Sequence, residues 1–228
     1  MNTITKVILL CLFISNTPTK AQRVPDGGLW STFSLEFALN KKFGMFVTEE
    51  IRFKENLTRV NLFYTNVGLE YKIVKGLKTS LSYRPTQKIT DENLISHRHR
   101  IQWDVAAKKS FGNFDLSYRH RLQAEVKNFF TSDNGNLMEW YSRNKVQLKY
   151  DFDKPLTPYL SIEMRYQIRD ARSPESNYVW HRSRYQGGFD YEINSHNLMG
   201  AYYMFQEEYN IADPESQQII GLEYTYKF

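Results

Sequence analysis

A basic motif recurs along the sequence and is the first pattern that could carry chemistry. Its form is Arg-x-Arg/Lys-apolar-Gln, and it occurs four times. The cationic members are Arg98, Arg100, Arg119, Arg121, Arg143, Lys145, Arg182 and Arg184, and a fifth segment adds Arg165 and Arg169. Residues two apart point to the same side of an extended strand, so each motif presents paired positive charges to one surface. Rings of Arg and Lys select anions in pores, and this pattern therefore predicts anion attraction where it faces water.

A second pattern is the pair His181 and Ser183. By strand parity both share a face with Tyr185 and Phe189, so we expect them on an apolar outer wall. The His-x-Ser pair resembles outer-membrane phospholipases and lipid A deacylases, in which a Ser nucleophile and a His base act on lipid. Those families carry Asn after the Ser, whereas this chain has Arg184, and no orienting Asn, Asp or Glu stands out. A lipid hydrolase is therefore the alternative function.

The remaining titratable residues indicate no other catalytic centre. His97, His99 and His120 also fall on apolar faces by parity, so they do not converge with His181 on a metal. The sequence shows no Gly-rich phosphate loop, no Cys pair and no carboxylate dyad. We expect no metal and no cofactor.

The amino terminus has the order of a secretory signal peptide. Lys6 precedes an apolar run over 7–14, and Thr19 and Ala21 are small residues before a cleavage site. A membrane anchor fits less well, because the run is about half the roughly 20 residues that a spanning helix needs. We expect a signal peptide over 1–21 and one domain over 22–228. Cleavage removes two lysines and the single Cys, so the formal net charge falls from +5 to +3 and no disulfide is possible.

The rest of the chain alternates apolar and polar residues with a period of two, which is typical of strands and does not fit helices. In the segment after Leu156, for example, Leu160 and Ile162 alternate with Ser161 and Glu163. The mean hydropathy of −0.58 therefore averages two opposite faces. Eleven strands are predicted, over about 28–39, 42–54, 59–73, 77–89, 95–108, 113–127, 138–152, 157–171, 178–193, 197–210 and 216–228.

The connections between these strands alternate between tight turns and longer polar loops. This alternation is typical of an outer-membrane barrel with short periplasmic turns. The sequence predicts an all-β, antiparallel, up-and-down transmembrane barrel of 10–12 strands in the outer membrane, in contact with lipid and lipopolysaccharide. Aromatic residues near strand ends are expected at the membrane interfaces: Phe129, Phe130, Trp140, Tyr141, Tyr178, Trp180, Tyr202 and Tyr203. Single-chain bacterial barrels have an even strand number, so a count of eleven requires an unusual pairing or two merged strands.

The carboxy terminus alternates Tyr224, Tyr226 and Phe228. This ending resembles the signal that the outer-membrane barrel assembly machinery recognises. Four stretches of the sequence are also informative: Gly28-Leu29-Trp30, Glu49-Glu50-Ile51-Arg52-Phe53, Gly68-Leu69-Glu70-Tyr71-Lys72 and Leu81-Ser82-Tyr83-Arg84. Through these stretches the chain resembles a family of small Bacteroidota barrels of unknown function (DUF2490-like). The resemblance implies a barrel and its location, and it implies no activity.

Two interpretations of the interior charge remain open. The charged side chains can pair into a plug that fills a narrow barrel, or they can form a constriction that attracts a small anionic solute. We expect basic residues nearer the outside and acidic ones, such as Asp104 and Asp190, nearer the periplasm. Export and the lipid-facing rows exclude a nucleic-acid binder, despite the basic and aromatic composition. The sequence thus favours a non-enzymatic barrel, either structural or an anion-leaning pore, or else a fixed partner in an envelope assembly.

Overall fold

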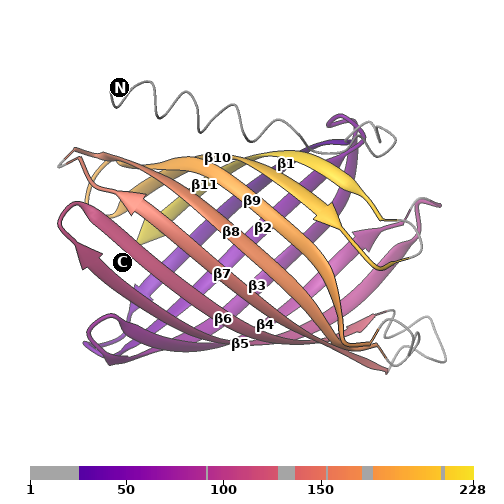
Figure 1. Ribbon diagram of the computed structural model, residues 1–228, viewed down its shortest axis with the longest axis horizontal. Helices are drawn as coiled ribbons and strands as arrows, with labels where there is room; N and C mark the ends of the chain where they lie inside the picture. The colour runs from indigo at the N-terminus through magenta and orange to yellow at the C-terminus, as the bar shows by residue number, and fades with distance from the viewer. Residues whose placement is uncertain (1–25, 91, 128–136, 153, 171–176, 212–213) are drawn as a thin grey trace, which may run out of the picture.

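The alternating segments form eleven long strands that close into a barrel in a computed structural model of the chain (Figure 1). The structure describes residues 26–90, 92–127, 137–152, 154–170, 177–211 and 214–228, so the predicted signal peptide lies outside it. The strands are β1 (Asp26–Ala38), β2 (Phe43–Lys54), β3 (Arg59–Val74), β4 (Leu77–Ile89), β5 (Ile95–Phe111), β6 (Phe114–Lys127), β7 (Met138–Tyr150), β8 (Leu156–Arg169), β9 (Val179–Glu192), β10 (Asn197–Glu208) and β11 (Ser216–Lys227). The predicted all-β, up-and-down barrel and its eleven strands are confirmed. The described part of the chain contains no helix long and apolar enough to cross a membrane.

The barrel carries its apolar side chains outside and its polar side chains inside. Leu81 and Tyr83 of β4 are 59% and 46% exposed, whereas the alternating Ser82 and Arg84 are both 7% exposed. Among the described residues, thirty-eight large hydrophobic side chains are exposed and only eight hydrophobic side chains are buried. Soluble monomers rarely expose a continuous apolar surface of this extent, and the outer wall is thus compatible with an apolar environment.

Successive strands pair as antiparallel hairpins, so the connections fall at two ends of the barrel. At the turn end, the connections join β1 to β2, β3 to β4, β5 to β6, β7 to β8 and β9 to β10, and at the loop end they join β2 to β3, β4 to β5, β6 to β7, β8 to β9 and β10 to β11. The three longest intervals between strands, 128–137, 170–178 and 209–215, separate strand ends that lie at the loop end, as the sequence predicts.

The barrel closes through one parallel pair, between β1 and β11. With an odd number of up-and-down strands, the first and last strands run in the same direction, so their pairing must be parallel. The register runs from Asp26 beside Gln217 to Glu36 beside Lys227. Unusual pairing, and not a merged strand, therefore explains the odd count. Because of it, Asp26 lies at the loop end and Phe228 at the turn end.

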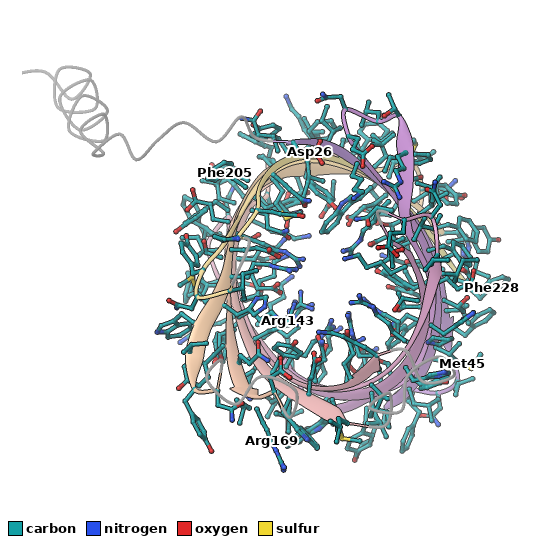
Figure 2. All side chains as sticks on the ribbon, turned by 90° about the vertical axis from the view of Figure 1, so that its right-hand side faces the viewer. Asp26, Met45, Arg143, Arg169, Phe205 and Phe228 are labelled. Carbon is teal, nitrogen blue, oxygen red and sulfur yellow. The ribbon has the colours of Figure 1, made fainter. Side chains whose placement is uncertain are left out.

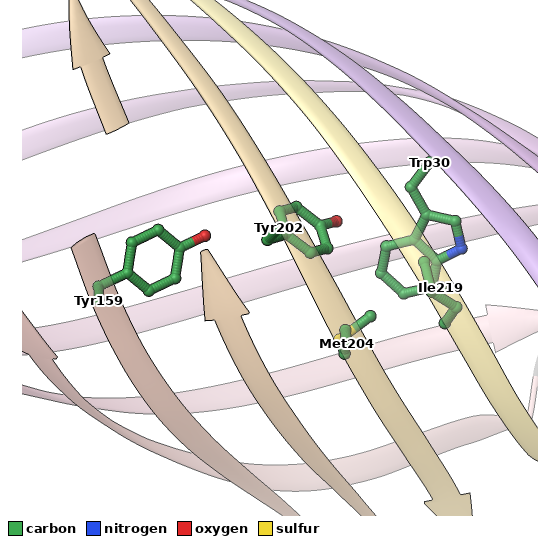
Figure 3. Packing of buried hydrophobic residues seen from close by; sticks show 5 residues of the cluster. All are labelled: Trp30, Tyr159, Tyr202, Met204 and Ile219. Carbon is green, nitrogen blue, oxygen red and sulfur yellow. The ribbon is translucent and has the colours of Figure 1, made fainter. Parts of the chain in front are cut away.

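Apolar packing supports this seam on its inner side. Figure 3 shows the buried cluster there, which consists of Trp30, Tyr159, Tyr202, Met204 and Ile219. The Tyr202 ring lies across Gly221, its neighbour on β11, because a Cβ atom on that glycine would be 1.9 Å from Tyr202 Cζ. The absence of a side chain at this glycine is thus what allows the ring to cover the inner face of β11.

Aromatic stacking supports the seam on its outer side. Phe33 of β1 stacks on Tyr224 of β11 at 5.7 Å between ring centroids, and Phe37 stacks on Phe228 at 4.4 Å. The backbone N–H of Phe228 also donates to the carbonyl oxygen of Glu36 at 2.9 Å. The last strand is therefore held to the first by rings as well as by the sheet hydrogen bonds.

Other outer rings gather near the strand ends, although two of the predicted interface residues are misplaced. Tyr166 packs against Trp180 at the loop end, at 5.2 Å between ring centroids. Tyr141 and Tyr202 face the interior instead and are 1% and 8% exposed, so their assignment to the membrane interface is wrong. Phe129 and Phe130 lie outside the described residues.

The close fit of Tyr202 over Gly221 gives a stability prediction. We expect Gly221→Ala to lower the free energy of unfolding by about 1–3 kcal/mol, because the added methyl group must displace the ring. Urea unfolding in detergent, followed by tryptophan fluorescence, measures this change. Gly44→Ala is the control, since its Cβ would meet only the Phe37 carbonyl oxygen at 3.4 Å. In a Tyr202→Ala background the cost should disappear, and a cost that persists there contradicts this packing.

Candidate functional site

The interior of the barrel holds a row of cavities. The loop-end cavity has a volume of about 280 Å³, the central cavity about 530 Å³ and the turn-end cavity about 820 Å³. Neighbouring cavities share wall residues, so they follow one another along the barrel axis. Figure 2, a view along that axis, shows interior side chains around an open centre, with Arg143 pointing inward. The lumen is therefore not completely filled by the described side chains.

Four arginines separate the loop-end cavity from the central cavity. Arg52, Arg100, Arg165 and Arg182 line both cavities, and with Trp30 they are the residues common to the two. They come from β2, from β5 and from the neighbouring strands β8 and β9, so they approach the lumen from three positions around the barrel. We call these four residues the arginine ring. A ring of this kind puts a positive constriction across the lumen.

Carboxylates neutralise only part of the ring. Arg52 forms an ion pair with Glu50, Arg100 Nε donates to Glu125 at 2.7 Å, and Arg182 forms an ion pair with Glu208. Arg165 has no carboxylate partner among the described residues, and its guanidinium carbon lies 3.6 Å from the centroid of the Tyr141 ring. The constriction therefore keeps positive charge after its ion pairs are counted.

One carboxylate in the central cavity accepts hydrogen bonds from three arginines. Glu163 accepts hydrogen bonds from Arg119 at 2.6 Å, from Arg143 Nε at 3.1 Å and from Arg184 at 3.2 Å. The carboxylate is buried, with a side-chain exposure of 8%. We call these four residues the Glu163 hub, and it carries more positive than negative charge.

The central cavity as a whole is strongly cationic. Eleven cationic side chains and four carboxylates line it. Lys145 has no ion pair and Arg84 has no carboxylate partner within the described part of the chain. The Arg84 guanidinium instead lies 3.8 Å from the centroid of the Tyr64 ring and donates to Asn66. The positive charge of Arg84 is thus stabilised by an aromatic ring and an amide, and not by a carboxylate.

The structure brings nine of the ten predicted basic residues to the lumen, in the loop-end or the central cavity. The exception is Arg169, whose inward assignment is wrong. A register shift between β7 and β8 leaves Ile168 without a partner and sets Arg169 beside Trp140. This β-bulge reverses the parity of the strand end, and Figure 2 shows Arg169 outside the barrel wall.

The predicted separation of charge along the axis is not found. Glu125 and Glu208 line the loop-end cavity, which was expected to be basic, and Lys72, Lys78 and Lys108 line the turn-end cavity, which was expected to be acidic. The loop-end cavity is lined by eight cations and four carboxylates and the turn-end cavity by eight cations and one carboxylate, so both ends of the lumen have a cationic excess, as the central cavity does.

The predicted pair of His181 and Ser183 is divided between the two faces of the wall. His181 sits in a β-bulge of β9 and lines the loop-end cavity, where its ring meets that of Tyr141 at 5.8 Å. Ser183 alternates with the inward Arg182 and Arg184, so it faces outward, where its hydroxyl hydrogen-bonds to that of Tyr209 at 2.8 Å. The expected common outer face is wrong, and the pair cannot act as nucleophile and base in this geometry. No group of three metal-binding side chains occurs among the described residues.

Sequence reasoning missed several interior residues that shape the site. Arg52 and Arg84 lie outside the repeated motif, and Trp30 and Tyr202 look like ordinary strand aromatics. Arg52 covers the Trp30 ring, with its guanidinium carbon 3.5 Å from the ring centroid. Strict parity within β2 and β4 could have found the two arginines, because each alternates with outward apolar neighbours.

The Glu163 hub gives a second stability prediction. We expect Glu163→Gln to lower the free energy of unfolding by about 3–5 kcal/mol, because it leaves three buried guanidinium groups without their carboxylate. Asp115→Asn breaks the more exposed ion pair with Lys108 and should cost about 1 kcal/mol or less. Urea titration of both variants in detergent measures the two changes. Equal losses in the free energy of unfolding would contradict the stabilisation of three arginines by Glu163.

Comparison with known proteins places the chain in a family. Residues 27–217 match the model of a family described as "Protein of unknown function (DUF2490)", and no curated protein matches the chain. The match extends from the start of β1 to the start of β11, so it includes the arginine ring and the Glu163 hub. The protein is thus a member of the DUF2490 family of proteins of unknown function.

Proposed function

We propose that the protein is an outer-membrane β-barrel whose lumen favours small anions. The outer wall supports the membrane location, because exposed apolar side chains cover strands of 12–17 residues. A strand tilted in a bilayer needs about 9–11 residues to cross it. The signal peptide expected over 1–21 provides the route of export.

The barrel assembly machinery is the partner proposed for insertion. Tyr224, Tyr226 and Phe228 end the last strand at the turn end, and Phe228 is 61% exposed. An exposed aromatic end of this kind is available to the machinery before the barrel closes. In this orientation the loop end faces outward and contacts lipopolysaccharide.

The location is tested by expression in a Gram-negative host. We expect cleavage after Ala21, recovery in the outer-membrane fraction, and a folded form that migrates differently on a gel before and after boiling. Intact mass and membrane fractionation measure these properties. A chain that lacks residues 1–21 is the control and should stay in the cytoplasm. Recovery of the full chain as a soluble periplasmic protein would contradict the proposal.

The observation that carries the anion preference is the cationic excess of the central cavity, which eleven cations and four carboxylates line. Three further carboxylates, Asp104, Glu125 and Glu208, pair with cations of this lining, so the cations still outnumber the carboxylates by eleven to seven. Uncompensated charge on a narrow, low-dielectric wall raises the local concentration of the opposite ion. A structural plug would pair its charges and leave no room for solute. The volumes of the three cavities and the unpaired Lys145 favour a passage over a plug.

Ion selectivity in planar bilayers tests this function. In a KCl gradient we expect the wild-type reversal potential to show preference for chloride. Replacing Arg165 and Lys145 with Gln should reduce the chloride-to-potassium permeability ratio by about two- to fivefold, since each charge acts over several ångströms in water. Arg169→Gln is the matched control, because that arginine is outside the wall. Absence of current at every voltage would favour the structural role, and equal effects of the inner and outer variants would contradict the site.

A further inference from the structure

Two polar side chains that line the loop-end cavity, those of Arg165 and His181, form no hydrogen bond with any described residue. Both contact the same aromatic ring. The Arg165 guanidinium carbon lies 3.6 Å from the centroid of the Tyr141 ring, and the His181 ring meets that ring at 5.8 Å between centroids. His181 is only 8% exposed. Since buried polar groups normally have hydrogen-bond partners, this pair lacks an acceptor.

Tyr141 holds both side chains in fixed positions. It is 1% exposed, and its hydroxyl donates to Glu139 at 2.6 Å. Glu139 in turn forms an ion pair with Lys127 at 2.6 Å. The ring is therefore held by packing and by this chain of polar contacts. Side chains that are ordered before a ligand arrives lose less conformational entropy when they bind it.

Neighbouring donors also lack acceptors. Arg98 Nε, Arg182 Nε and Gln167 Nε2 are buried and have no hydrogen-bond partner among the described residues. Arg182 is the neighbour of Arg165 across β8 and β9, and Gln167 is the neighbour of Tyr141 across β7 and β8. Guanidinium and amide nitrogens only donate hydrogen bonds. A group rich in acceptor oxygens would therefore suit this end of the lumen, whereas a cation would not.

The charges of this cluster match a dianion. Arg98 and Arg100 share Glu125, Arg182 pairs with Glu208, and Arg165 has no carboxylate among the described residues. The cluster contains five cations, Arg98, Arg100, Lys127, Arg165 and Arg182, and three carboxylates, Glu125, Glu139 and Glu208. Two positive charges are thus left without a carboxylate.

From these contacts we infer that Arg165, His181 and Arg182 form a binding site for a phosphate dianion, either free phosphate or the phosphoryl group of a small phosphomonoester. Guanidinium groups bind phosphate oxygens through short, charge-assisted hydrogen bonds, and the His181 ring adds a further donor. The cavity of about 280 Å³ is near the lower size limit of small-molecule sites, so a large ester is excluded. This inference deepens the proposed function and rests on it for access to the lumen.

Inorganic phosphate and glycerol 3-phosphate are the probes, and acetate is the monoanion for comparison. At about pH 8 both phosphates are mainly dianions. We expect detergent-solubilised protein to bind at least one of them about tenfold or more tightly than acetate by isothermal titration calorimetry, corrected with protein-free micelles. Equal affinity for the two phosphates would support a site for the free ion, and tighter glycerol 3-phosphate would support a site for an ester.

Arg165→Met is the most informative variant. Because Arg165 has no carboxylate partner among the described residues, its removal leaves no buried acid unpaired, and the barrel should still fold. We expect phosphate binding to weaken about tenfold or more, since a charge-assisted hydrogen bond is lost. His181→Phe keeps a ring against Tyr141 and removes the nitrogen donors, so it is the second variant and should also weaken phosphate binding. Gel migration before and after boiling verifies the folded barrel.

Arg169→Met is the matched control, because Arg169 lies outside the barrel wall (Figure 2) and should bind phosphate as the wild type does. Weakened binding in Arg165→Met or His181→Phe, with unchanged binding in this control, supports the inference. It is overturned if neither phosphate binds, if acetate binds equally well, or if both inner substitutions leave phosphate affinity unchanged. Calorimetry does not use ion current, so failure of the phosphate site is distinguished from failure of the anion passage, which the reversal potential reports.

Discussion

The parallel pairing of β1 with β11 is the constraint on which the rest of the barrel depends. Parallel ladders have slanted hydrogen bonds and are slightly less stable per residue than antiparallel ones, so the seam needs support from side chains. The rings of Phe33 and Phe37 supply it on the outer face, and the cluster around Tyr202 and Ile219 supplies it on the inner face. Because that inner support is apolar, the cations of the central cavity come from the remaining strands. The asymmetric lumen is a consequence of how the barrel closes.

The interior charge is stabilised by a limited number of acids and by aromatic rings. Glu163 and Glu125 each contact more than one arginine, so a single carboxylate offsets several guanidinium groups. Arg84 and Arg165, which lack carboxylate partners among the described residues, lie over Tyr64 and Tyr141. Cation–π contact lowers the cost of removing a guanidinium group from water without cancelling its charge. Because rings and not acids contact these two arginines, the lumen keeps their positive charge at a lower cost in folding free energy.

Much of the fold is predictable from the sequence, because a strand with one apolar and one polar face has only one period. Parity correctly placed the eight basic residues of the repeated motif, and Arg165 of the fifth segment, in the lumen. It failed where a bulge inserts one residue, at Ile168 before Arg169 and at His181 before Ser183. A bulge is a local change in pairing with no strong signature in a single sequence. The two bulges affect the lining of the lumen in opposite ways. The structure places Arg169 outside the lumen, where parity predicts it inside, and places His181 inside, where parity predicts it outside.

The composition of the cavities was harder to predict than the faces, because it depends on register between strands. The ion pair of Arg121 with Asp104 joins neighbours on adjacent strands, and parity alone leaves their relative height undetermined. Interior acids and bases therefore mix along the axis, although their order in the sequence suggests two separate zones. Cations outnumber carboxylates in the lining of all three cavities, by eight to four at the loop end, eleven to four in the centre and eight to one at the turn end. A solute moving along the axis from the loop end would therefore meet a rising ratio of cations to carboxylates. The preference for anions is accordingly expected to be a property of the whole lumen and not of one cavity.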